Sequence, residues 1–432
     1  MVNKFSARGW SAFGAKPISI SLSPNVQKDD VVLALKLLFS PWKWKTPSAG
    51  SGQGGNAIEK LEHNFRNYLG VKNAISFNSG RSSLYAILKA LELPLGSKIL
   101  MQTFTCNAVV NPILWAGLEP VYVDCADDFN IDLEDLKKKI TKNAKVLIVQ
   151  HTFGLPAHMD EVAHIMRQNG GIVIEDCAHA LGAESNEKKV GTFGDVAFFS
   201  FSRDKVISSV YGGMATTNND QIGEKLKSLQ KEFGQPGMIW IKQQILHPIL
   251  LYFFILPLYH FLDLGKVFLV LSQYLHLLSK AVSWQEKRGL RPDYFPKALP
   301  NALAAMAQNQ FKKLEKFNTH RKKIAEFYYK ELEGTKFGLP EKSGNIFLRF
   351  AVTHPKAHEI IYEAWNKENI LIGDWYTSVI APIDTQLDKM RYIEGMCPKA
   401  ENLAKKTLNL PTHINISMED AKRVVDFLKK YA

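Results

Sequence analysis

Three short segments of this chain carry side chains that could act together in catalysis. The first, residues 173–183, reads VIEDCAHALGA: an apolar run ends at Asp176, and His179 follows three residues later. A carboxylate at the end of a half-buried strand needs a partner, because an unpaired charge is costly to bury. Taken alone, Asp176 is equally consistent with capping of the next helix.

The second segment, residues 195–219, reads DVAFFSFSRDKVISSVYGGMATTNN and holds Ser200 and Lys205 ahead of the pair Gly212 and Gly213. A lysine after a strand is usually a solvated charge. An amine in a partly desolvated loop loses its proton more readily and attacks carbonyl groups, which is what Schiff-base chemistry requires. Lys205 is therefore a candidate nucleophile.

The third segment, residues 76–88, reads SFNSGRSSLYAIL and predicts a strand, a turn at Gly80 and Arg81, and then a helix. Backbone N–H groups at a helix N-terminus beside an arginine form an anion site, although the same pattern also occurs in a simple tight turn. Together the segments offer a phosphate cradle, a carboxylate and an amine. Pyridoxal phosphate needs all three: an acid partner for its ring nitrogen, a lysine for its aldehyde and a site for its phosphate.

Alternating short apolar runs and helical patterns must position these side chains. The predicted strands are residues 74–77, 98–101, 120–123, 146–149, 172–175 and 197–201. Strands separated by helices indicate βαβ units and an α/β fold with a mostly parallel sheet. Ligands of such sheets bind beyond the carboxyl ends of the strands, where the polar residues above are found.

With these motifs in this order, the sequence resembles the DegT/DnrJ/StrS family of fold-type I sugar aminotransferases. The most specific matches are VIEDCAHALGA and FSFSRDK, and the resemblance covers most of the chain. It implies a large domain with a mostly parallel sheet flanked by helices, and a smaller C-terminal α+β domain. The expected parts are an N-terminal arm (1–55), a large cofactor-binding domain (56–234), an apolar helical insertion (235–290) and a C-terminal small domain (291–432).

The resemblance implies a role for each candidate residue around pyridoxal phosphate. Lys205 would hold the cofactor covalently and later move protons at the substrate carbon. Asp176 would bind the pyridine nitrogen, and His179 would lie near the phenolic oxygen. Phe104 would stack on the ring, although core packing explains a phenylalanine there equally well.

The resemblance further implies that Ser200, Gly80 and Arg81 hold the cofactor phosphate. In the family an Asn-x-Arg loop also reaches into the phosphate site of the neighbouring subunit of a homodimer. Here the corresponding positions are Pro296 and Ala298. Lys297, between them, is a candidate substitute.

A lysine rather than a histidine at position 205 favours amino transfer over the dehydration carried out by a minor class of the family. The expected reaction moves an amino group from glutamate to a keto group of a nucleotide-activated sugar, for cell-surface polysaccharide or glycan synthesis. Two alternatives stay open. One is a different elimination or exchange reaction on the same cofactor, and the other is a non-catalytic, membrane-associated binding component.

The apolar stretch between residues 245 and 278 is a second departure from the family pattern. Its runs, 245–262 and 267–278, approach the roughly 20 residues that a membrane span needs, but the first contains two prolines and two histidines. Buried helices or a subunit contact, an interfacial or re-entrant hairpin at a membrane surface, and a full span are the alternatives.

Composition limits the remaining choices. The 432 residues carry a formal net charge of +12, which suits anionic ligands or surfaces, and no pattern typical of nucleic-acid binding is present. Four cysteines without a CxxC pair indicate neither a metal site nor a disulfide framework. The first residues lack a signal-peptide pattern, so we expect a cytoplasmic protein with possible membrane contact through residues 245–278.

Overall fold

The computed structural model describes residues 17–45, 57–259 and 264–432. Residues 1–16 and 46–55 of the expected N-terminal arm lie outside these ranges.

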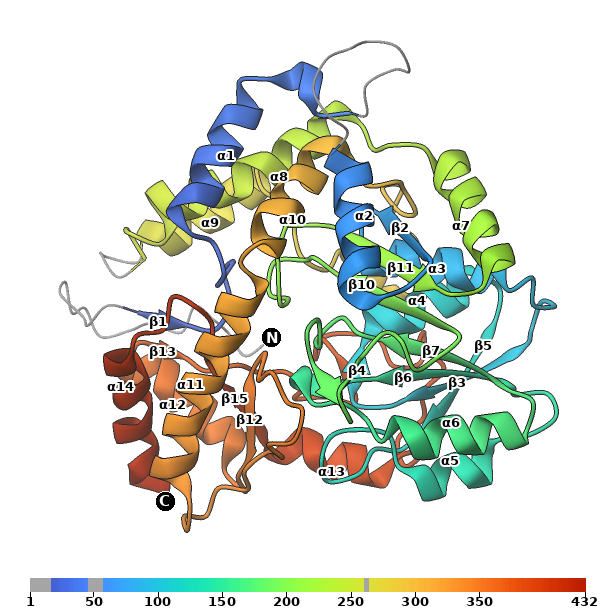
Figure 1. Ribbon diagram of the computed structural model, residues 1–432. Helices are drawn as coiled ribbons and strands as arrows, with labels where there is room; N and C mark the ends of the chain where they lie inside the picture. The colour runs from blue at the N-terminus through green and yellow to red at the C-terminus, as the bar shows by residue number, and fades with distance from the viewer. Residues whose placement is uncertain (1–16, 46–56, 260–263) are drawn as a thin grey trace.

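A seven-stranded sheet forms the centre of the larger part of the molecule (Figure 1). Its order is β2-β11-β10-β7-β6-β3-β5. The strands are β2 (Asn73–Phe77), β3 (Lys98–Gln102), β5 (Glu119–Val123), β6 (Val146–Gln150), β7 (Ile172–Asp176), β10 (Val196–Ser200) and β11 (Gly213–Thr217). All six predicted strands are present, and β10, β7, β6, β3 and β5 run parallel. Only β11 is antiparallel to its neighbours, so the prediction of a mostly parallel sheet is confirmed.

Both faces of this sheet are covered by apolar helix surfaces, because alternate residues of a strand point to opposite sides. In β6, Val146 and Ile148 join one core cluster with helices α3, α4 and α7, whereas Leu147 and Val149 join another with α5 and α6. These helices are α3 (Gly80–Ala90), α4 (Asn107–Trp115), α5 (Leu133–Lys139), α6 (Met159–Gln168) and α7 (Asp220–Phe233). A sheet buried on both sides leaves its strand ends as the place for polar chemistry.

Helix α2 (Ala57–Leu69) is amphipathic. Leu61, Phe65 and Leu69 are its buried residues, spaced one helical turn apart. Gly70 follows with a φ of +70°, a left-handed conformation that favours glycine and ends the helix.

The C-terminal part is a smaller α+β unit at the lower left of Figure 1. Its antiparallel pair β12–β15 is packed among helices α11, α12 and α14 around a separate apolar core. The bounds are α10 (Asn301–Phe311), α11 (Leu314–Leu332), β12 (Phe350–Thr353), α12 (Ala357–Glu368), α13 (Pro398–Lys406), β15 (Thr407–Leu410) and α14 (Met418–Leu428). Two short pairs link it to distant segments: β1 (Ile18–Ser19) with β13 (Ile370–Leu371), and β4 (Thr105–Cys106) with β14 (Ile380–Ala381).

The apolar residues after 237 form helix α8 (Met238–Leu250), the π-helical segment η3 (Leu251–Ile255) and helix α9 (Leu264–Tyr274). Helix α8 packs against α1 (Lys28–Leu38) and α10. Among the described residues, Met238–Ile255 is the one helical stretch with the length and composition to cross a membrane, and half of it is buried in the protein. Much of α8 therefore belongs to the protein core.

Candidate cofactor site

The fold brings the three chemical segments together at one edge of the sheet. Strand β7 ends at Asp176, strand β10 ends at Ser200, and helix α3 begins at Gly80 directly after β2. Lys205 lies in the loop that follows β10. Because β2, β11, β10 and β7 are successive strands of the sheet, the cradle, the amine and the carboxylate share one site.

Lys205 is half-buried, and its Nζ lies 4.7 Å from the centroid of the Trp375 ring. Within the described residues this ammonium forms no ion pair. Burial, with a smaller contribution from Arg349, lowers the pKa of Lys205 to about 8 against the opposing effects of Cys106 and Asp176. A substantial fraction of the amine is therefore neutral near physiological pH, as a nucleophile requires.

Asp176 is buried at the end of β7, where its Oδ1 accepts a hydrogen bond from the backbone N–H of Ala178 at 3.0 Å. Burial raises the pKa of Asp176 to about 6, against the opposing effects of that hydrogen bond and of nearby Lys205. A buried carboxylate with one oxygen unfilled by the described residues fits a protonated pyridine nitrogen, which would supply the missing partner.

His179 is buried in a stack of aromatic rings. Its ring lies 5.3 Å from that of Trp375, nearly parallel, and its Nδ1 accepts the backbone N–H of Phe153 at 3.3 Å. Burial, with the charges of Lys205 and Arg349, keeps the pKa of His179 well below its usual value. The imidazole is therefore neutral with its proton on Nε2, which faces the Tyr376 hydroxyl at 3.4 Å.

The phosphate cradle is built at the start of α3 by two close backbone approaches. A Cβ on Gly213 would lie 2.5 Å from the carbonyl oxygen of Ser79 and 2.6 Å from the nitrogen of Gly80. A Cβ on Gly80 would lie 3.0 Å from the Cβ of Ser200. The first N–H groups of a helix have no intrahelical partner, so this N-terminus fits an anionic phosphate.

Arg81 lies at the cradle, but its guanidinium turns away toward the segment that follows α9. Its Nε is 2.8 Å from Oε1 of Glu286, and its Nη2 donates to the carbonyl of Ala281 at 3.0 Å. Glu286 is fully buried. The structure thus gives Arg81 a partner that the sequence did not suggest, and a direct contact between Arg81 and phosphate remains a proposal.

Arg203 is a second buried cation on this side of the site, and sequence reasoning did not single it out. Its Nη2 donates to Ser279 Oγ at 2.6 Å, and its guanidinium lies 5.5 Å from the Tyr211 ring centroid. Among the described residues, its Nε has no hydrogen-bond partner. The sequence FSRDK could have pointed to Arg203, because this arginine stands two residues before Lys205.

Phe104 lies in a cluster of buried aromatic side chains. Its side chain has no exposed surface and packs against the rings of Phe129, at 5.6 Å, and Tyr376, at 5.4 Å. Cys106, two residues further along, is half-buried and feels the charges of both Arg81 and Lys205. The stacking role expected for Phe104 stays a prediction, and Cys106, which lies within reach of the charge of Lys205, is a second candidate for contact with the ring.

Arg349 and Trp375 are further site residues that the sequence did not reveal. The guanidinium of Arg349 lies 3.5 Å from the centroid of the Trp375 ring, the same ring that Lys205 approaches. Burial lowers the pKa of Arg349, while Asp204 and Asp374 raise it. Both residues come from the C-terminal part, so their place beside Lys205 depends entirely on tertiary structure.

A cluster of His151, Glu175 and Cys177 lies next to the site and contains metal-ligand residue types. The Glu175 carboxylate is occupied by His151 Nε2 at 3.1 Å and by three backbone N–H groups of residues 191–194. We interpret this cluster as the support that fixes the loop before β10.

The segment in place of the Asn-x-Arg loop is tied to its own subunit. Ala298 forms a β-bridge with Phe77, and the backbone N–H of Asn78 donates to the Lys297 carbonyl at 2.9 Å. The Lys297 ammonium donates to the carbonyl of Phe233 at 3.0 Å, at the end of α7. These contacts hold Lys297 within its own chain, and its role as a substitute in the neighbouring subunit's phosphate site stays a prediction.

Comparisons with known proteins identify the family of this chain. The sequence profile of the DegT/DnrJ/EryC1/StrS aminotransferase family matches residues 45–244 and 294–429. An uncharacterized protein of Methanocaldococcus jannaschii is 42% identical over 172 residues, which is 40% of this chain and 45% of that protein. A GDP-perosamine synthase of Vibrio cholerae is 27% identical over 87% of this chain and 91% of its own length.

Solved structures show the same fold. The aminotransferase PseC of Helicobacter pylori, involved in the biosynthesis of pseudoaminic acid, aligns with a TM-score of 0.73 at 22% identity, over 96% of this chain and 99% of that one. The fold-type I architecture expected from the sequence is confirmed. With a family match over more than half of its length, this chain belongs to the DegT/DnrJ/EryC1/StrS aminotransferases, which depend on pyridoxal phosphate.

Proposed function

We propose that this enzyme transfers an amino group from glutamate to a keto group of a nucleotide-activated sugar, in the synthesis of a cell-surface glycan. The observation that carries the proposal is Lys205, an amine with a lowered pKa that shares one sheet edge with Asp176 and the α3 cradle. The name GDP-perosamine synthase, given to a relative over most of its length, supports a nucleotide-linked sugar as acceptor.

Pyridoxal phosphate, when bound, supplies an electron sink for the carbon that gains or loses the amine. Lys205 would hold the cofactor covalently, and its amine would carry a proton to and from the reacting carbon. The Asp176 carboxylate would hold the ring nitrogen in its protonated form. The neutral His179 imidazole donates a hydrogen bond from Nε2 toward the Tyr376 hydroxyl. The neighbouring rings of Phe153 and Trp375 limit the access of water.

Arg349 supports an amino-acid donor such as glutamate. Its buried guanidinium and the Lys205 amine both lie near the ring of Trp375. An amino-acid donor that reacts beside Lys205 can therefore place a carboxylate near the Arg349 guanidinium. We expect Arg349→Gln to raise the KM for glutamate at least about tenfold while the KM for the sugar changes less than about twofold. The matched control is Arg391→Gln, an exposed arginine paired with Glu119.

We further propose a homodimer in the cytoplasm. The family resemblance supports the dimer, and the four cysteines, all free in the described structure, support a reducing compartment. Light scattering of the purified protein measures the first. Fractionation of cells that produce the full chain measures the second.

The decisive experiment incubates purified, yellow enzyme with glutamate and a set of nucleotide-linked keto sugars. Formation of 2-oxoglutarate and of an amino sugar, seen by mass spectrometry, is the expected result, and Lys205→Ala abolishes both. The control Lys280→Ala changes an exposed lysine outside the site and keeps the activity. A deoxy sugar without new nitrogen would establish the elimination reaction instead, and a colourless protein that does not bind the cofactor would establish a binding component.

A further inference from the structure

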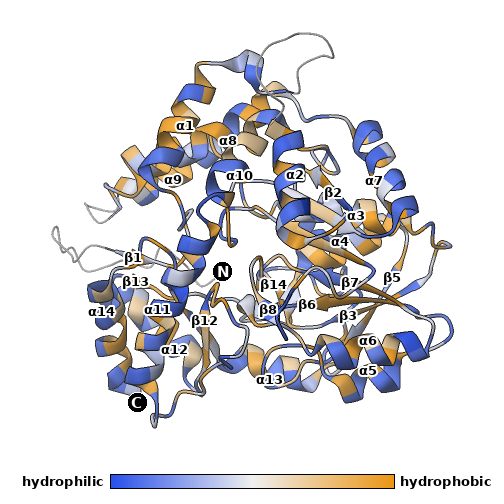
Figure 2. Cartoon of the chain, in the orientation of Figure 1, coloured by the Kyte–Doolittle hydropathy of each residue, from blue (hydrophilic) through white to orange (hydrophobic). Residues whose placement is uncertain are grey.

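Segment η3, helix α9 and the residues next to them expose many large apolar side chains, defined here as the apolar face: Tyr252, Phe253, Phe254, Leu256, Leu264, Val267, Phe268, Val270, Leu271, Tyr274, Leu275 and Leu277. Figure 2 shows hydrophobic residues along helices α8 and α9. Among the most exposed members of the apolar face are Phe253 at 50%, Val267 at 58%, Leu275 at 55% and Tyr274 at 79%. Soluble monomers rarely leave so many large apolar side chains exposed together, so this face calls for a partner.

The apolar face is held in a defined shape. Helix α9 folds back on η3 so closely that a Cβ on Gly265 would lie 2.2 Å from the carbonyl oxygen of Ile255. The rings of Phe254 and Phe268 stack across the turn at 5.9 Å, and both remain partly exposed. The opposite side of the same segment packs inward, with Leu251 and Ile255 buried against Trp365. One side thus anchors the hairpin, and the other faces outward.

The apolar face lies outside the part of the chain that the family profile matches. The family profile matches residues 45–244 and resumes at 294, so it leaves out nearly all of this hairpin. It also leaves out α1, which packs beside α8 and exposes Val32 at 41% and, just beyond its end, Phe39 at 75%. Two neighbouring segments outside the family profile therefore both expose apolar side chains.

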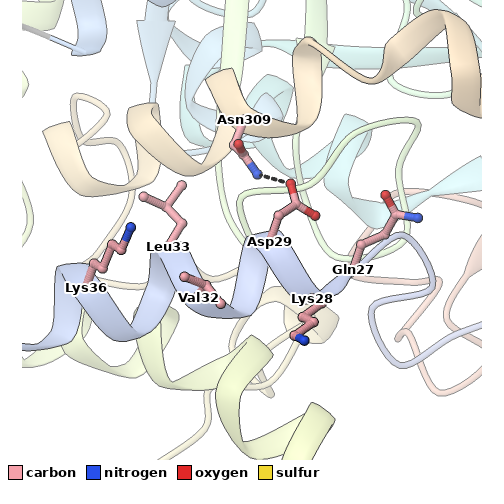
Figure 3. Close-up of a pocket in the computed structure, with 7 residues that line it drawn as sticks. All are labelled: Gln27, Lys28, Asp29, Val32, Leu33, Lys36 and Asn309. Carbon is pink, nitrogen blue, oxygen red and sulfur yellow. Dashed lines mark hydrogen bonds between the residues drawn. The ribbon is translucent and has the colours of Figure 1, made fainter.

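The charge around the apolar face is positive. Between residues 238 and 285 the sequence contains three lysines and a single acid, Asp263, and Lys242 and Lys280 are exposed. Figure 3 shows Lys28 and Lys36 on α1, lining an open groove with Val32. The neighbouring Asp29 carboxylate accepts a hydrogen bond from Asn309. Exposed cations at the border of an apolar surface complement anionic lipid headgroups.

We propose that the apolar face docks this enzyme on a membrane rich in acidic phospholipid, lying in the interface rather than crossing it. Half of Met238–Ile255 is buried in the protein, and His247 within it bonds Ser23 at 2.8 Å. A span would have to remove α8 from α1 and α10, whereas docking uses only side chains that are already exposed.

The test is co-sedimentation of the full-length holoenzyme with vesicles of phosphatidylcholine alone and with 30% phosphatidylglycerol added. We expect binding to the acidic vesicles that weakens with added salt. The triple variant Phe253→Ser, Val267→Ser, Leu275→Ser should reduce the partition coefficient at least about tenfold, because it removes three apolar side chains from the contact. The control Leu95→Ser changes a leucine that is 84% exposed on a different part of the molecule and should bind like the wild type.

Two further measurements separate membrane docking from misfolding and from self-association. Aminotransferase activity and thermal unfolding of the triple variant should match the wild type, because the substituted side chains are exposed and outside the cofactor site. Light scattering compares the oligomeric states. If the triple variant dissociates a wild-type oligomer, the apolar face is a contact between copies, and the proposal is overturned. Absence of wild-type binding to acidic vesicles overturns it as well.

Discussion

The Nε of Arg81 lies 2.8 Å from Oε1 of Glu286, and the carboxylate of this pair is completely buried. Burying two charges is favourable only while each neutralises the other. Glu286→Gln leaves the guanidinium unpaired, so we expect the free energy of unfolding to fall by about 3 kcal/mol in urea titrations. The control Glu224→Gln removes an exposed pair with Lys227 and should leave it unchanged. An equal effect of both variants would contradict the assignment.

Substitution of Asp176 should raise the stability of the cofactor-free protein at neutral pH and lower the activity of the enzyme. Because burial raises its pKa to about 6, the cofactor-free folded protein holds this proton more tightly than the unfolded chain does. Stability is therefore lost as the pH rises from about 4 through 6, by roughly 2–3 kcal/mol. Asp176→Asn should make the cofactor-free protein more stable than the wild type at pH 7.5 and equal to it near pH 4. Its activity should fall at least about a hundredfold. A variant less stable at pH 7.5 would refute this account.

Attachment of the cofactor should follow the protonation of Lys205. The neutral amine is the reactive form, and its pKa is lowered to about 8 by burial. The initial rate at which the cofactor-free enzyme takes up pyridoxal phosphate should rise about tenfold per pH unit below pH 8 and level off above it. Stopped-flow absorbance between pH 6 and 9.5 measures this. Reaction of exposed lysines should keep rising toward pH 10.5, and a similar profile for Lys205 would show that its amine is not perturbed.

Gly213 should be indispensable to the cradle. A Cβ at position 213 would clash with the backbone of Ser79 and Gly80, at 2.5 and 2.6 Å. Backbone atoms cannot move aside as the end of a flexible side chain can. Gly213→Ala should weaken pyridoxal phosphate binding at least about tenfold and lower stability by about 1–3 kcal/mol. Fluorescence titration with the cofactor measures the first effect. Gly237→Ala, at a glycine with open space around it, is the control.

Substitutions of Phe104 and Cys106 should distinguish core packing from contact with the cofactor. Phe104→Leu should lower the free energy of unfolding by about 1–3 kcal/mol with the cofactor Kd and absorbance maximum unchanged, because the ring packs in the core. Cys106→Ala should change the Kd or the absorbance with little effect on stability. The reverse result would assign the contact with the cofactor ring to Phe104.

The sequence was sufficient for the sheet and for the residues at its edge. Asp176 and Lys205 follow apolar runs, and the rule that parallel strands end at one edge places them together. Strand β11, GMATT, was not predicted because it lacks bulky strand-forming residues and owes its conformation to its two neighbours.

The contacts that the sequence did not reveal join residues far apart in the chain. Glu286 meets Arg81 across about two hundred positions, and Arg349 reaches Trp375 through the packing of the C-terminal part. The hydrophobic periodicity of the sequence does not show which distant residues will contact each other. The burial of Phe104 is similar, since an aromatic residue after a strand can face either a ligand or the core, and only the surrounding rings decide.

The gap in the family profile is not a line along which the protein can be cut. Residues 279–289 lie within the gap, yet they supply Ser279 to Arg203, Glu286 to Arg81, and the backbone carbonyl of Glu286 to Asn111 at 2.9 Å. An engineer who trims this enzyme to the length of its relatives would strip buried polar groups of their partners. A shortened form has to keep this stretch, and α8 with it, because α8 packs against α1 and α10 and its His247 is bonded to Ser23.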